Sequence, residues 1–196
     1  MQGVQQISPE AVLQWTEGPS QSAFMNENAV AMRWWPSGLF EAAQKFGDRL
    51  GVMPIPYGVR PNEAKYDGTG GTAAALGGWH LALNPNSQNK QAAVQALNAV
   101  AKIPFREFEF QELGYVPPDN TYLQTQRAKQ VDVWGDYLET IRLAGETAIP
   151  RPVTVVWPDE STAIADRVNA VLAQQQAPKQ AMSALKSTLQ DIEGSV

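Results

Sequence analysis

The 196-residue chain contains no cysteine and a single histidine, His80. This inventory excludes disulfides, thiol nucleophiles, zinc sites built from cysteine and histidine, and any Ser-His-Asp triad that does not use His80. Facing carboxylates are also scarce, because Glu107 and Glu109 are two residues apart on an expected helix and so point in different directions. We therefore expect no catalytic residues, no metal site and no cofactor, which argues against a carbohydrate-active enzyme or any other enzyme.

Positive charge is not clustered anywhere in the chain. The net charge is -5 and the sequence pI is near 4.9. Nucleic acid and anionic membrane both call for clustered Lys and Arg, so we exclude them as main partners. No apolar run is long enough to span a bilayer. The start, MQGVQQISPEAVLQW, lacks the basic region and apolar core of a signal peptide, which leaves two alternatives: a cytoplasmic protein, or a natural start upstream of Met1.

Hydrophobic spacing predicts strands that alternate with helices. Strands are expected at 29–35, 50–56 and 79–83, where apolar residues run together or alternate between prolines and glycines. Helices are expected after a cap at Ser87, at 105–113, and from Trp134 to a closing Gly145. Two more helices end the chain, with apolar faces that carry Ile164, Val168, Val171 and Leu172, and Met182, Leu185, Leu189 and Ile192. This order indicates an α/β fold with at least partly parallel pairing.

The central feature is a glycine pair followed by tryptophan. Gly77 and Gly78 let the backbone approach another group closely and expose its N–H groups, and Trp79 adds a large flat apolar face. His80 lies on the opposite side of the expected strand, so we interpret it as structural or exposed. The chain holds six tryptophans, which favours flat surfaces that receive a planar ligand.

Three motifs resemble one protein family. They are AFMNENAVAMRWWPSGLF at 23–40, TAAALGGWHLALNPNSQNKQAA at 72–93 and PRPVTVVWPDES at 150–161. In order and spacing they are similar to the extracellular solute-binding proteins of bacterial ABC sugar importers, specifically the trehalose, maltose and sucrose receptors. The resemblance implies a periplasmic-binding-protein-like fold of type II with two lobes, present here as its C-terminal half. It places residues 1–54 in the second lobe, 55–113 in the first, and 114–196 in the second again with the C-terminal helices.

The same resemblance implies the residues that contact a sugar. Trp35 and Trp79 match aromatic residues that line the sugar, although a tryptophan in the core is the alternative for each. Gly78 would donate its backbone N–H, unless it only marks a tight turn into a strand. Arg151 would bond adjacent hydroxyls with its planar fork, unless it forms a surface salt bridge. Ser37 replaces a tyrosine of the family, which removes an aromatic plate and argues against trehalose; Trp34 and Trp157 are secondary candidates that fit core packing better.

The function implied is that of a non-enzymatic receptor that closes on a di- or oligosaccharide and delivers it to an ABC transporter permease. Its location would be periplasmic or extracellular, with a lipoprotein anchor through the missing N-terminus as a further alternative. Its partners would be the permease and the missing N-terminal half of the same receptor. The alternative function is a stand-alone half-receptor module that acts through protein-protein association. Because much of the polar complement would lie in the missing half, we expect weak or undetectable sugar binding by this chain alone.

Overall fold

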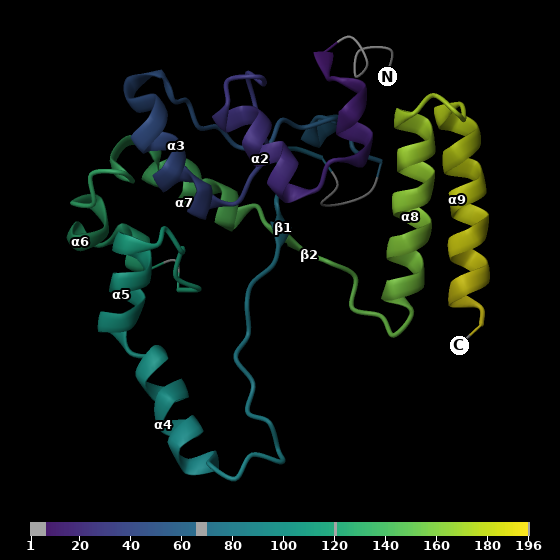
Figure 1. The fold of residues 1–196 in the computed structure, drawn as a ribbon. Coiled ribbons are helices and arrows are strands. Elements are labelled where there is room, and N and C mark those ends of the chain that lie inside the picture. The colour runs from purple at the N-terminus through teal and green to yellow at the C-terminus, as the bar shows by residue number, and fades with distance from the viewer. Residues whose placement is uncertain (1–6, 66–69, 120, 196) are drawn as a thin grey trace. The chain divides into compact units, whose positions relative to one another are not determined.

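The computed structural model describes residues 7–65, 70–119 and 121–195 (Figure 1). The chain divides into two compact units: unit 1 takes in Met1–Met32 and Pro152–Val196, and unit 2 is Arg33–Arg151. The lobe boundaries expected after residues 54 and 113 stay a prediction, because they concern the lobes of a longer protein.

Unit 1 is helical in its described part. Helices α8 and α9 lie side by side as a hairpin and bury Val171, Ala181 and Leu185 (Figure 1). Each has a proline in its first turn, where the missing N–H would be unpaired in any case. The two closing helices predicted from their apolar faces are therefore confirmed. The elements of unit 1 are the 3-10 helix η1 (Glu10–Gln14) and the helices α2 (Glu17–Met25), α8 (Trp157–Leu172) and α9 (Pro178–Glu193).

Unit 2 combines short helices with a single described pair of strands. Its helices are α3 (Leu39–Phe46), α4 (Lys90–Val100), α5 (Ile103–Glu112), α6 (Gln126–Lys129) and α7 (Leu138–Glu146), and its strands are β1 (Ala75–Leu76) and β2 (Ile149–Pro150). The 3-10 helices that join them in the described part of unit 2 are η2 (Pro36–Gly38), η3 (Gly47–Arg49), η4 (Pro61–Glu63), η5 (Tyr122–Gln124) and η6 (Gly135–Tyr137).

The helices predicted in unit 2 are present, with shifted ends. Helix α4 begins at Lys90 with Asn89 as its cap, so the prediction of a cap at Ser87 is wrong. The Ser87 hydroxyl instead accepts a hydrogen bond from the Asn89 backbone N–H at 3.1 Å, inside the turn before the helix. Helix α5 begins two residues before the expected 105, and Gly145 lies within the last turn of α7.

The predicted strands at 29–35, 50–56 and 79–83 are wrong as paired strands. Strand structure in the described residues is confined to β1 and β2, which run parallel with Ala75 opposite Ile149 and Leu76 opposite Pro150. The parallel pairing expected from the sequence is thus confirmed, but over two residues only. A strand needs a neighbour to satisfy its backbone N–H and C=O groups, and the described chain offers these segments none.

The core of unit 2 is built around Trp134, which is fully buried. Its ring stacks on Phe110 with centroids 4.8 Å apart and makes a T-shaped contact with the Phe40 ring, whose centroid is 5.4 Å away. The Tyr137 hydroxyl donates a hydrogen bond to the Leu50 carbonyl at 2.6 Å, which ties the segment after η3 to η6. The buried members of this core are Leu39, Phe110, Leu123, Ala128, Trp134, Leu138 and Ile141.

Helices long and apolar enough to cross a membrane do not occur in the described part of the chain.

Candidate functional site

The β1–β2 pair brings two of the sequence motifs together. Because the strands are parallel, the chain leaves both at the same edge: β1 continues into Gly77, Gly78 and Trp79, and β2 continues into Arg151. The Arg151 guanidinium lies against Gly77, where an added Cβ atom would be 3.7 Å from its Nη1 atom. A donor fork and a glycine-rich backbone therefore share one edge, although they are far apart in the sequence.

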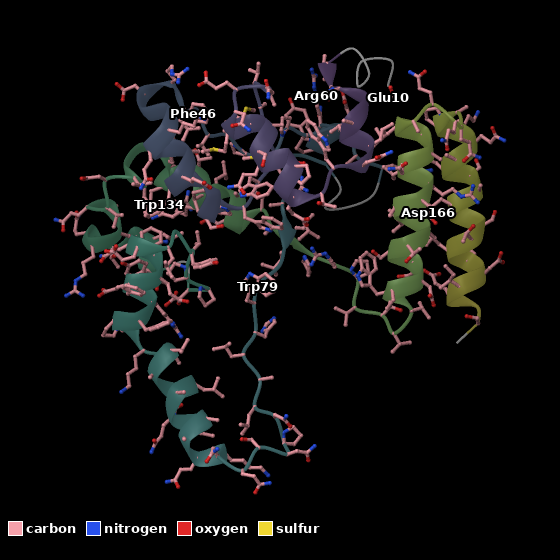
Figure 2. All side chains as sticks on the ribbon, viewed as in Figure 1. Glu10, Phe46, Arg60, Trp79, Trp134 and Asp166 are labelled. Carbon is pink, nitrogen blue, oxygen red and sulfur yellow. The ribbon has the colours of Figure 1, made fainter. Side chains whose placement is uncertain are left out.

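Trp79 projects from the extended segment beyond β1 (Figure 2). The residue is 94% exposed, which excludes the alternative of a core tryptophan within the described chain. Gly78 is also open, with no described atom within 4 Å of the position a Cβ would take. The ring and the backbone N–H beside it are accessible to a ligand, but they lie on an open surface and not in an enclosed pocket.

The second tryptophan pair is held by the turn of η2. The Trp34 ring lies over Gly38, and an added Cβ there would collide with its Cδ1 atom and lie 2.6 Å from its Nε1 atom. Trp35 meets Trp34 edge to face, with centroids 5.1 Å apart, and is 56% exposed. Ser37 is half-buried in the same turn. Trp34 is thus a support that packs inside the turn, while Trp35 presents its ring to solvent.

The structure brings together only part of the predicted site. Gly78, Trp79 and Arg151 share the edge of the β1–β2 pair, and Trp34, Trp35 and Ser37 share the η2 turn. Between these two groups, no ring contact or hydrogen bond joins residues that the structure describes. Trp157 is the half-buried first residue of α8 and belongs to unit 1, whereas the other six belong to unit 2.

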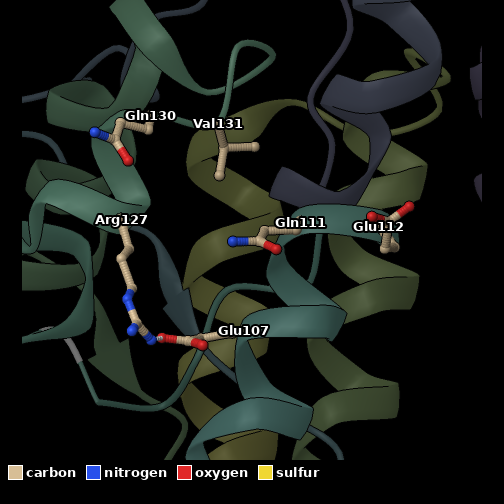
Figure 3. A pocket seen from close by; sticks show the side chains of 6 residues that line it. All are labelled: Glu107, Gln111, Glu112, Arg127, Gln130 and Val131. Carbon is tan, nitrogen blue, oxygen red and sulfur yellow. Dashed lines mark hydrogen bonds and ion pairs between the residues drawn. The ribbon is translucent and has the colours of Figure 1, made fainter.

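A separate cleft lies between α5 and α6, where the sequence had indicated nothing (Figure 3). It measures about 500 Å³ and is lined by Glu107, Gln111, Glu112, Arg127, Gln130 and Val131. Arg127 donates a hydrogen bond to Glu107 at 2.7 Å, and this bond together with the carboxylate charge raises the pKa of the arginine. The carboxylate of Glu107 on α5 is therefore paired with a cation from α6. The residues that line this cleft form no sequence motif, so the cleft could not be predicted without the structure.

Groups of three or more metal-binding side chains are not found among residues 7–65, 70–119 and 121–195.

Two comparisons with known proteins identify similar chains, and no family model matches. The chain is 28% identical over 195 residues to the "Probable ABC transporter-binding protein" of Deinococcus radiodurans, covering 95% of this chain and 43% of that protein. Its structure matches "Maltose bound T. maritima MalE3" with a TM-score of 0.74 and 23% identity, covering 96% of this chain and 46% of that chain. The chain has a periplasmic-binding-protein-like fold. It spans less than half the length of either protein that shows this likeness.

The fold expected from the sequence motifs is therefore confirmed. The Deinococcus protein is named as a transporter-binding protein, and the T. maritima protein was solved with maltose bound. Neither name describes an enzyme, which agrees with the expectation that this chain is not an enzyme. Which half of the binding-protein fold the chain represents stays a prediction.

Proposed function

We propose that the chain is the C-terminal half of the sugar-binding receptor of an ABC importer and that it contributes Trp79, Trp35 and Arg151 to the sugar site. The observation that carries the proposal is the parallel β1–β2 pair, which sets an exposed indole and an open glycine backbone beside an arginine. The similarity to a transporter-binding protein and to a protein solved with maltose supports it.

These groups suit the two kinds of surface that a sugar offers. The C–H face of a sugar ring is apolar and stacks on an indole, so Trp79 and Trp35 would act as plates. The hydroxyls need fixed donors, and the fork of Arg151 can bond two adjacent hydroxyls at once. The backbone N–H of Gly78 has no described hydrogen-bond partner, so it can donate to a third hydroxyl of the sugar. A ligand with several rings, a di- or oligosaccharide, would use both plates.

The receptor would work by a population shift between open and closed arrangements of two lobes. A sugar that contacts both lobes favours the closed form by the difference between its affinities for the two forms. The closed form would then be recognised by a membrane permease, and the protein would act in the periplasm or outside the cell, free or as a lipoprotein. We do not propose the stand-alone module, since neither similar protein is described as one.

Sugar titrations test this function. The samples are the chain alone and the chain co-expressed with the part of the D. radiodurans protein outside the matched region, which we name the complementary half. Calorimetry with maltose, trehalose and sucrose is expected to give saturable binding by the complex and weak or no binding by the chain alone. Submicromolar binding by the chain alone would contradict the need for a second half. A folded complex that binds no sugar would overturn the function.

A further inference from the structure

Trp35, the second of the two proposed sugar plates, has a fixed backbone but a ring that is largely in solvent. Pro36 follows it and restricts Trp35 to the extended conformation that the structure shows, φ -78° and ψ 152°. The Trp35 carbonyl accepts a hydrogen bond from the Gly38 backbone N–H at 3.1 Å, which closes the η2 turn. The residue is 56% exposed, so burial alone does not hold its indole in one orientation. The ring needs a neighbour if it is to meet a sugar in a single pose.

Trp34 is that neighbour. Among the ring contacts of the described residues, the one that Trp35 makes is with Trp34, at 5.1 Å between centroids and 70° between ring planes. A T-shaped arrangement at this distance is a favourable geometry for two aromatic rings, so the contact stabilises one orientation of the Trp35 ring over others. Because more than half of Trp35 stays exposed, the contact leaves ring surface open for a sugar.

The Trp34 ring is held in turn by the space that a glycine leaves. An added Cβ atom at Gly38 would collide with the Trp34 Cδ1 atom and lie 2.6 Å from its Nε1 atom. The backbone angles of Gly38 suit any residue, so glycine serves here to make room for the indole and not to allow an unusual conformation. Trp34 therefore packs inside the turn on one side and contacts Trp35 on the other.

The η2 turn is anchored to the core of unit 2. The ring of Phe40, two residues after the turn, makes its T-shaped contact with the buried Trp134. Gly114, at φ 70°, lies against the turn from another segment, where an added Cβ would be 2.8 Å from the Phe40 Cδ2 atom and 3.2 Å from the Ser37 carbonyl oxygen. Close-packed interiors move little, so these contacts fix the turn that carries Trp34.

We propose that Trp34 is a positioning residue for the sugar plate: it holds the Trp35 ring in the orientation that a sugar meets, and it does not contact the sugar itself. The inference rests on the proposed function, since it needs Trp35 to be a plate. The role differs from direct contact and from core packing, the two alternatives that the sequence left open for Trp34. A side chain that is ordered before binding loses less conformational freedom when the ligand binds, which is worth about three- to tenfold in affinity. Trp34 therefore affects sugar affinity through Trp35.

A cycle of single and double substitutions tests whether Trp34 acts through Trp35. Maltose is titrated by calorimetry into the chain bound to the complementary half, with Trp34→Ala and Trp35→Ala made singly and together. Trp34→Ala should weaken binding by about three- to tenfold, and Trp35→Ala by about tenfold or more. Once Trp35 is replaced, the further change Trp34→Ala should alter the affinity by less than about twofold.

The cycle separates failure of this inference from failure of the sugar site. If Trp34→Ala has the same effect with and without Trp35, or has no effect in the single variant, the positioning role is wrong. If Trp35→Ala binds maltose as the unmodified protein does, the proposed plate itself is wrong. Trp15→Ala is the matched control, because it removes another half-buried tryptophan, one that lies in unit 1. A loss of affinity in Trp15→Ala equal to that in Trp34→Ala would also overturn the inference.

Gly38→Ala provides a second variant that keeps both indoles but displaces one of them. Two indoles as close as those of Trp34 and Trp35 couple electronically and give a pair of bands of opposite sign in circular dichroism, which the chain alone can show without sugar. Trp34→Ala and Trp35→Ala should remove the same pair of bands, and Gly38→Ala should weaken it, because the new methyl group occupies the space of the Trp34 ring. Gly38→Ala should also weaken maltose binding by about three- to tenfold in the complex. An unchanged affinity of Gly38→Ala, with or without the pair of bands, would overturn the inference.

Discussion

The indole nitrogen of Trp134 donates a hydrogen bond to the backbone carbonyl of Phe110 at 3.0 Å, and the two rings stack nearly parallel. One side chain thus fixes η6 to α5 both through its ring and through its polar edge. Trp79 is the opposite case, with its ring in solvent. Tryptophan is thus found in this chain both as a buried core residue and as an exposed ring, and only the exposed ring could act as the sugar plate that we propose.

Trp134→Phe should lower the free energy of unfolding by about 1–3 kcal/mol, since the buried Phe110 carbonyl loses its donor. Trp134→Ala should cost about 3–5 kcal/mol, because it also opens a cavity in the core. Urea denaturation followed by circular dichroism measures both. Trp79→Phe is the matched control and should lie within about 0.5 kcal/mol of the unmodified chain. Equal stability of Trp134→Phe and Trp79→Phe would contradict the core described here.

Gly38→Ala should destabilise unit 2 although its backbone angles, φ -70° and ψ -10°, suit alanine. The new methyl group would occupy the space of the Trp34 ring, so the ring must move and release its contact with Trp35. We expect a loss of about 1–3 kcal/mol from overpacking. The double substitution Gly38→Ala with Trp34→Ala makes room for the methyl group and should cost less than the sum of the two single changes. Strict additivity in urea denaturation would show that the ring does not lie over Gly38.

Alkaline pH should destabilise unit 2 through Tyr122. Burial raises the pKa of its hydroxyl above the usual value near 10, and the charge of Glu107 raises it further. The folded state therefore holds the phenol proton more tightly than the unfolded state does. The stabilisation is fully present below pH 10 and is lost as pH rises through the folded pKa. Stability measured from pH 8 upward should fall less steeply for Tyr122→Phe than for the unmodified chain, and identical slopes would rule out this contribution.

The helices could be predicted from the sequence because their signal is local. Leu185 and Leu189 lie one turn apart on α9, and that spacing alone specifies a helix with one apolar face. The strand predicted at 79–83 depends on a neighbour, and the described chain supplies a partner only as far as Leu76. The sequence pattern of a segment indicates that it can form a β-strand. It does not indicate whether another strand lies beside it to accept and donate the backbone hydrogen bonds.

The residues of the candidate site are predicted for a different reason, and their role in binding stays a prediction. Motifs shared with a resembling family indicate Trp79 and Arg151, while the edge that the two residues share depends on the pairing of Leu76 with Pro150, which no local pattern encodes. The cleft at Glu107 and Arg127 has neither a motif nor a local pattern, and it arises only where α5 meets α6.

Arg151→Lys tests whether the fork geometry of the arginine matters or only its charge. Lysine keeps the positive charge but cannot bond two adjacent hydroxyls in one plane. In the complex with the complementary half, sugar affinity should fall by about tenfold, in line with the loss of one hydrogen bond to a charged group. Calorimetry measures this change, and association of the two halves should be unaffected. If the lysine variant and the unmodified protein bind the sugar with equal affinity, the two-pronged hydrogen bonding of Arg151 does not contribute and only its positive charge matters.

Trp79→Ala should separate ligand binding from folding more cleanly than any other substitution. Because the ring is almost entirely exposed, its removal should leave the free energy of unfolding within about 0.5 kcal/mol of its original value. In the complex, the loss of a stacking plate should weaken sugar binding by about tenfold or more, as expected for an aromatic anchor. His80→Ala changes the next residue on the opposite side of the segment and should leave the affinity unchanged. The sugar site is wrongly placed if His80→Ala weakens binding as much as Trp79→Ala does, since both sides of the segment would then matter equally.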